Sequence, residues 1–155
     1  MKLVPLMEFD SEISDTQVVG DTLFGSRKIY IIGGGNFWGE RINGQALSGG
    51  GDWVLINAQG LARLDVRKTI RTDDGALINM SYQGYYRYDD ALTAQVASGE
   101  GYEFGDNLFQ VQVQFECGDS RYAWLNTTLA VAEGRETGST IHYRVFEVLS
   151  DRAAS

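Results

Sequence analysis

Side chains that could act in acid–base chemistry recur at alternate positions between Leu61 and Thr72. In an extended strand, alternate side chains point to opposite faces of the sheet. One face of this stretch carries Arg63, Asp65, Arg67, Thr69 and Arg71, and the other carries Leu64, Val66, Lys68 and Ile70. A carboxylate withdrawn from water accepts protons, and a neighbouring guanidinium stabilises the anion that forms. The stretch therefore indicates proton-transfer chemistry if its polar face lines a hollow, the alternative being a wet outer surface.

A second alternating stretch runs from Tyr122 to Thr128 and would place Tyr122, Trp124 and Asn126 on one face. An exposed row of large aromatic residues is unusual, which favours a ligand-binding lumen behind these residues. The candidate catalytic residues are Asp52 or Asp65 as the base, Arg67 as the group that polarises an oxygen, and Tyr122 as a hydrogen-bond donor. The candidate substrate-binding residues are Trp53, Tyr82, Glu116, Trp124 and Asn126. A buried ion-pair network that only holds the sheet together is the structural alternative.

Other catalytic templates find little support in the sequence. One Cys and one His are too few for a zinc site of thiolate and imidazole ligands. The chain has no Gly-x-Ser-x-Gly elbow to accompany His142, and Cys117 follows Glu116, whose carboxylate disfavours a reactive thiolate. Gly33-Gly34-Gly35 is not followed by the Lys and Ser or Thr of a phosphate-binding loop. We therefore expect carboxylate and arginine chemistry with no metal and no cofactor.

Length and composition narrow the class of protein. The chain has 155 residues and 43% hydrophobic residues, which suits one globular domain, expected over residues 1–149, with a C-terminal tail at 150–155. A net charge of -8 argues against nucleic acid and anionic membranes as partners, because both bind clustered Lys and Arg. No stretch has the roughly 20 apolar residues of a membrane span. We expect a cytoplasmic protein whose partner is a small molecule, and unpaired sheet edges favour a homodimer.

The elements that would position these residues are short strands. Runs of Val, Ile, Tyr, Phe and Thr are separated by Gly and Asp, which is typical of an antiparallel sandwich or barrel. The expected strands are 2–9, 16–24, 27–32, 36–47, 52–57, 61–72, 76–82, 108–116, 123–132 and 140–149. One short helix, capped by Asp89 or Asp90 and ended by Gly99, would cover one end of the barrel.

Three ordered motifs make the chain resemble a known family from about residue 2 to residue 148. They are Gly34-Gly35-Asn36-Phe37 to Gly51-Asp52-Trp53, Leu64-Asp65-Val66-Arg67 to Asp73-Asp74-Gly75, and Phe115-Glu116 to Arg121-Tyr122-Ala123-Trp124-Leu125-Asn126. The chain is similar to the family called domain of unknown function 3237. The resemblance implies an all-β, closed, calycin-like or lipocalin-like antiparallel β-barrel of about ten strands, with no activity established for the family at large. The site residues within these motifs are carried over, while Glu40, Lys68 and Cys117 depart from the family's pattern.

Three functions follow from this pattern. The first is a cofactor-independent enzyme that binds a small, partly aromatic carbonyl metabolite in the barrel lumen and moves a proton, as an isomerase, lyase or cyclase does. The second is a non-catalytic carrier for a small hydrophobic metabolite. The third is a structural or interaction protein with a solid barrel and a large apolar outer patch.

Overall fold

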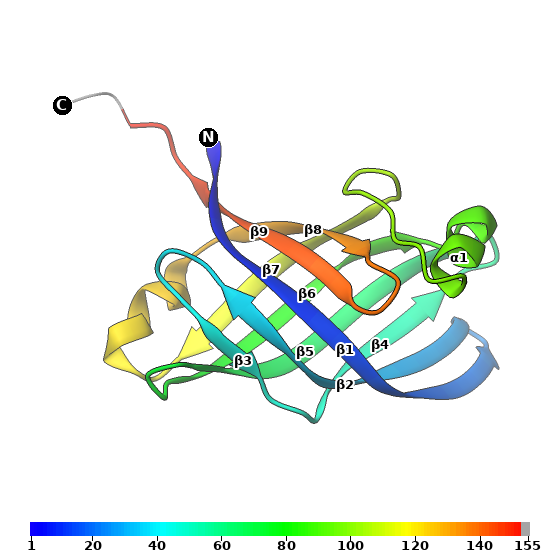
Figure 1. Ribbon diagram of the computed structural model, residues 1–155, viewed down its shortest axis with the longest axis horizontal. Helices are drawn as coiled ribbons and strands as arrows, with labels where there is room; N and C mark the ends of the chain where they lie inside the picture. Colours follow the sequence, from blue (N-terminus) through cyan, green and yellow to red (C-terminus); the bar gives the residue numbers. More distant parts are fainter. Residues whose placement is uncertain (153–155) are drawn as a thin grey trace.

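The computed structural model describes residues 1–152, and in that range one antiparallel sheet contains nine strands (Figure 1). The strands are β1 (Lys2–Thr22), β2 (Gly25–Trp38), β3 (Gly44–Ala46), β4 (Gly50–Ile56), β5 (Leu61–Thr72), β6 (Leu77–Arg87), β7 (Phe109–Cys117), β8 (Ala130–Glu136) and β9 (Ile141–Leu149). Two helical segments join them, α1 (Asp90–Ala97) and the 3-10 helix η1 (Ser120–Thr127). The predicted tail at 150–155 lies outside the described residues from 153 onward.

Eight of the strands close into a ring. The order β1-β9-β8-β7-β6-β5 continues through β4 and β2 and returns to β1, while β3 bridges β2 and β5 at one end. Every pair is antiparallel, which allows consecutive strands to be joined by short connections. The longer connections are those that contain α1 and η1. This ring confirms the prediction of an all-β protein with a closed antiparallel sheet. The ring resembles a barrel.

Several of the predicted strands are wrong in extent. The stretch 27–32 and the start of the stretch 36–47 both belong to β2, and residues 39–43 lie between β2 and β3. The stretches 2–9 and 16–24 belong to a single strand, β1, which pairs with β9 over its first half and with β2 over its second. The stretch from residue 123 to 132 begins inside η1 instead of a strand. The Asp119 side chain caps η1 by accepting the Arg121 amide at 2.9 Å, which favours a helical turn over continued extension.

The core fills the inside of the ring with the apolar face of each strand. Along β5 the buried residues are Ala62, Leu64, Val66, Lys68, Ile70 and Thr72, and the residues between them are more exposed. The polar face of this stretch therefore points outward, as in most antiparallel sheets. Lys68 is the exception, because it lies on the apolar face with 3% of its surface exposed.

The two ends of the ring are covered differently. Helix α1 lies at one end and η1, the gold coil, at the other (Figure 1). The Asp89 carboxylate caps α1 by accepting the Leu92 amide at 2.9 Å, and Gly99 follows its end with a φ of 93°, so the predicted short covering helix is confirmed. Buried Leu125 anchors η1 to the core.

The β1–β2 hairpin extends beyond the point where β1 leaves β9 at Ser11. This opening between β1 and β9 lies at the α1 end of the ring and gives access to the interior. Among residues 1–152, neither helical segment has the length and apolar character needed to span a bilayer.

Candidate functional site

A cavity of about 320 Å³ opens inside the ring at the α1 end. We call it the interior cavity. Val96 of α1, the loop at Gly138, and Ile13 of β1 surround its mouth. A Cβ atom at Gly138 would meet the Gly99 carbonyl oxygen at 2.5 Å, so a glycine is needed where the loop after α1 passes the β8–β9 turn. The wall residues are Ser11, Tyr30, Asp52, Val54, Leu64, Tyr86, Tyr88, Phe109, Glu136, Ser139, Thr140, Ile141 and Tyr143.

Asp52 is a partly buried acidic group in this wall. It lies on β4 on the same face as buried Val54, and its Oδ1 accepts the Asp65 backbone amide at 3.0 Å. Burial raises the pKa of Asp52 to about 6, against the opposing effect of that hydrogen bond, and the Asp65 carboxylate raises it further. A carboxylate with a pKa near 6 is mostly ionised at neutral pH and is a stronger base than one in water.

Phenol groups surround the carboxylates of the interior cavity. The Tyr30 and Tyr88 hydroxyls lie 3.0 Å apart, and the Tyr86 hydroxyl donates to Glu136 Oε2 at 3.0 Å. Burial is the main cause that raises the pKa values of Tyr86, Tyr88 and Tyr143 well above 10, and in Tyr88 and Tyr143 the Asp52 charge adds to it. These phenols therefore stay protonated at neutral pH and can donate hydrogen bonds.

The sequence-predicted residues do not meet in one place. Asp52 faces the interior cavity and Tyr82 is buried inside the ring, but Asp65, Arg67 and Glu116 lie on outward-facing positions of β5 and β7. The prediction that Arg67 and two aspartates share a lumen is therefore wrong. The physical reason is the strand period, since Asp65 and Arg67 alternate with the buried residues Leu64, Val66 and Lys68.

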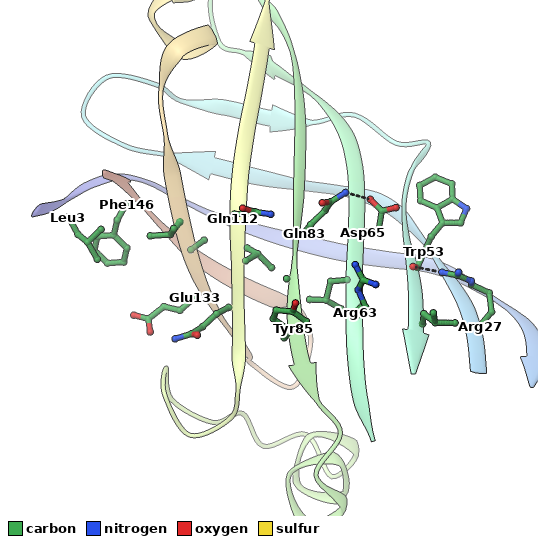
Figure 2. Close-up of a pocket in the computed structure, with 17 residues that line it drawn as sticks. Leu3, Arg27, Trp53, Arg63, Asp65, Gln83, Tyr85, Gln112, Glu133 and Phe146 are labelled. Carbon is green, nitrogen blue, oxygen red and sulfur yellow. Dashed lines mark hydrogen bonds between the residues drawn. The ribbon is translucent and has the colours of Figure 1, made fainter. Parts of the chain in front are cut away.

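Trp53 and Asp65 line a second hollow on the outside of the sheet. This outer groove, of about 800 Å³, runs across β4 to β9 (Figure 2). Figure 2 shows Trp53 and Arg27 at one end and Leu3 and Phe146 at the other, and Gln83 Nε2 donates to Asp65 Oδ1 at 3.2 Å between them. Trp53 is 40% exposed. The groove offers amides and aromatic surface for binding, but its charged groups stay in contact with water.

Tyr122, Trp124 and Asn126 belong to η1, at the end of the ring away from α1. The Tyr122 hydroxyl donates to Asp74 at 2.9 Å, and Arg41 stacks over the Trp124 ring at 4.1 Å. Asn126 accepts the Cys117 amide at 2.8 Å and donates to the Cys117 carbonyl at 2.9 Å. The three side chains hold η1 against the sheet, and none of them lines the interior cavity.

Sequence reasoning missed several groups of the site. Tyr30, Glu136 and Tyr143 each stand in an ordinary strand, and only the closure of the ring brings them together. The sequence could have indicated Lys68, because it is the one charged residue on the buried face of β5. A single charge at such a position indicates a group with a special environment.

The closed ring, the covering helix and the phenol-lined hollow define a barrel-like antiparallel protein with an internal cavity. The chain belongs to the family described as "Protein of unknown function (DUF3237)", whose model matches residues 1–148. A UPF0311 protein from Rhodopseudomonas palustris (strain ATCC BAA-98 / CGA009) is 30% identical over 139 residues, which cover 90% of this chain and 91% of that relative. A UPF0311 protein from Clostridium acetobutylicum is 31% identical over 105 residues, which cover 68% of this chain and 66% of that relative.

Solved structures share the architecture. A beta-barrel-like protein from Acinetobacter baumannii superposes with a TM-score of 0.79 at 33% identity, covering 94% of both chains. A conserved protein of unknown function from Rhodopseudomonas palustris superposes with a TM-score of 0.84 at 28% identity, covering 96% of this chain and 97% of the other. An enzyme from Penicillium herquei superposes with a TM-score of 0.69 at 18% identity, covering 93% of both chains, and this likeness supports the fold alone.

Proposed function

We propose that this protein is a cofactor-independent enzyme that binds a small, partly aromatic carbonyl compound in the interior cavity and transfers a proton, as an isomerase, lyase or cyclase does. The observation that carries the proposal is the partly buried Asp52 carboxylate in the cavity wall, whose pKa is raised to about 6, beside phenols that remain protonated. Such a carboxylate can accept a proton from carbon next to a carbonyl group.

The proton transfer would balance within the cavity. Asp52 takes a proton from the carbon next to the carbonyl, and the electron pair of that C–H bond moves to the carbonyl oxygen as an enolate. A phenol such as Tyr88 or Tyr143 donates a hydrogen bond to this oxygen. The proton then returns from Asp52 to another atom of the same molecule, which yields an isomer. These phenols take the role that the sequence predicted for Arg67.

Exchange of hydrogen for deuterium in a probe ketone tests the proposal. We expect the protein to accelerate deuterium uptake at the carbon next to the carbonyl of 2-tetralone, followed by NMR in deuterated buffer. The Asp52→Asn variant is expected to lower this rate by at least about 100-fold, since general-base catalysis contributes 10²–10⁴-fold. Asp73→Asn, in the exposed turn between β5 and β6, is the matched control and keeps the wild-type rate.

The carrier function is the second candidate, because the Asp52 carboxylate is already occupied by the Asp65 amide and the cavity wall contains Val54, Leu64 and Phe109. Binding of 2-tetralone, seen as NMR shifts of cavity residues, without exchange above the buffer rate would support the carrier and contradict the enzyme. Wild-type exchange by Asp52→Asn would also contradict the assignment of the base.

A further inference from the structure

Ser11 and Lys68 form a buried pair that proton transfer by Asp52 does not use. Ser11 lies on β1, lines the interior cavity and is 2% exposed. Lys68 lies on β5 beneath it and is 3% exposed, and its Nζ is 3.1 Å from Ser11 Oγ. A serine hydroxyl that faces a cavity thus has an amine within hydrogen-bond distance on its inner side.

The surroundings of Lys68 are apolar. Its Nζ lies 3.8 Å from the centre of the Phe9 ring and 5.4 Å from that of Tyr82, and Met7, Phe37 and Met80 pack around it. The titratable groups that face it are Asp10 of β1 and Tyr82 of β6. Among residues 1–152, Lys68 forms no salt bridge with a carboxylate. Burial lowers the pKa of Lys68 to about 7, partly opposed by Asp10, so about half of this amine is neutral at pH 7.

We propose that Ser11 and Lys68 form a nucleophile–base dyad that accepts an acyl group from small neutral esters bound in the interior cavity. A serine paired with a lysine is a known variant of the serine–histidine arrangement, in which a neutral amine replaces the imidazole. The arrangement is recognised by geometry, and here the nucleophile, its base and a hollow for the substrate lie together.

Each step of the acyl transfer balances. Ser11 Oγ attacks the ester carbonyl carbon while Lys68 Nζ takes the hydroxyl proton. The C–O bond to the alcohol then breaks, and Lys68 returns its proton to the leaving alcohol. Water repeats the sequence on the acyl-serine and releases a carboxylic acid. The Tyr143 phenol lines the interior cavity, and because burial raises its pKa it stays protonated and can donate to the developing oxyanion.

The cavity also restricts the substrate class. A volume of about 320 Å³ is at the small end of ligand pockets, which suits an ester of about 10–15 heavy atoms. Asp52 and Glu136 in the wall repel an anionic substrate, while the phenols and Phe109 provide aromatic surface. A neutral aryl ester such as 4-nitrophenyl acetate meets these conditions.

Covalent labelling tests the dyad directly. We incubate the full chain with a neutral ethyl fluorophosphonate, whose P–F bond breaks as Ser11 Oγ bonds to phosphorus, and measure the adduct by intact mass. Fragment-ion mapping is needed because Ser11 and Ser14 lie in one tryptic peptide. The expected result is one adduct on Ser11, loss of it in Ser11→Ala, and labelling at least about 100-fold slower in Lys68→Met. Ser14→Ala, on the same strand outside the cavity wall, is the matched control and labels at the wild-type rate.

Hydrolysis of 4-nitrophenyl acetate is expected to follow the same order among the variants. No adduct on the wild-type chain, an adduct that persists in Ser11→Ala, or an unchanged rate in Lys68→Met would overturn the dyad. The Ser11→Ala/Lys68→Met double variant removes both buried partners together, which preserves folding better than leaving one unpaired. A folded double variant without the adduct supports the proposal, and one that labels at the wild-type rate overturns it.

Discussion

Replacing Lys68 with methionine changes the pH dependence of stability in a direction that the structure determines. Burial lowers the pKa of Lys68 from 10.5 to about 7. Between these two pH values the unfolded chain binds a proton at this lysine that the folded chain does not. The free energy of unfolding therefore rises with pH in this window, and the penalty from Lys68 is largest below pH 7.

The size of the effect follows from the same two pKa values. They correspond to a penalty of about 4.5 kcal/mol at pH 6.5 and about 2 kcal/mol at pH 9. The advantage of Lys68→Met over the wild-type chain should then shrink by about 2.5 kcal/mol across this range. Differences in side-chain packing do not depend on pH, so they cancel when the two pH values are compared. In melting temperature the change is about 5–10 °C for a chain of this length.

Urea unfolding at four pH values between 6.5 and 9, followed by circular dichroism, measures this difference. The raised tyrosine pKa values contribute equally to the free energy of unfolding of both proteins, so they cancel in the difference. Lys2→Met replaces an exposed lysine and should show no trend with pH. A constant difference between Lys68→Met and the wild-type chain, or one that grows with pH, would refute the assignment of a buried amine with a lowered pKa.

Two further predictions concern other parts of the structure. The partly buried Asp52 carboxylate, whose pKa is about 6 instead of 3.8, holds a proton in the folded chain that the unfolded chain releases, so stability falls as pH rises through this window. Urea unfolding should show that Asp52→Asn removes about 2 kcal/mol of this fall between pH 4.5 and 7, whereas an equal fall in both proteins would contradict the raised pKa. Asn126→Ala should lower the free energy of unfolding by about 2 kcal/mol, because the Cys117 amide and carbonyl lose their partners. Its exchange of 2-tetralone per folded molecule should equal that of the wild-type chain, and a loss of exchange would place η1 in the site.

The sequence was sufficient to predict the fold because its signals are local. Alternation along β5, the Asp73-Asp74-Gly75 turn between β5 and β6, and the Asp89 cap of α1 each depend on residues close together in the chain. Strand limits were less predictable. Nothing between residues 9 and 16 breaks the extended chain, so β1 runs through the predicted gap and uses register shifts to bend.

The site was harder to predict because it depends on which face of each strand turns inward. Alternation places Asp65 and Arg67 together but does not say on which side of the sheet they lie. Asp52 lies in the wall of the interior cavity, on the same face of β4 as Val54. Tyr30, Glu136 and Tyr143 come from three strands that are distant in sequence, and only pairing across the closed ring makes them neighbours.

Asp52 and Lys68 are desolvated charges that lower the stability of the folded chain. Among residues 1–152 neither Asp52 nor Lys68 takes part in a salt bridge, so each is desolvated without an ion-pair partner. Their pKa values correspond to penalties of about 3 and 4 kcal/mol at neutral pH, which together are comparable to the 5–15 kcal/mol that stabilises a typical domain. Apolar residues of similar volume would remove both penalties without changing the ring. Asp52 and Ser11 line the interior cavity, and Lys68 Nζ lies 3.1 Å behind Ser11 Oγ, so both desolvated charges stand where the two proposed chemistries need them.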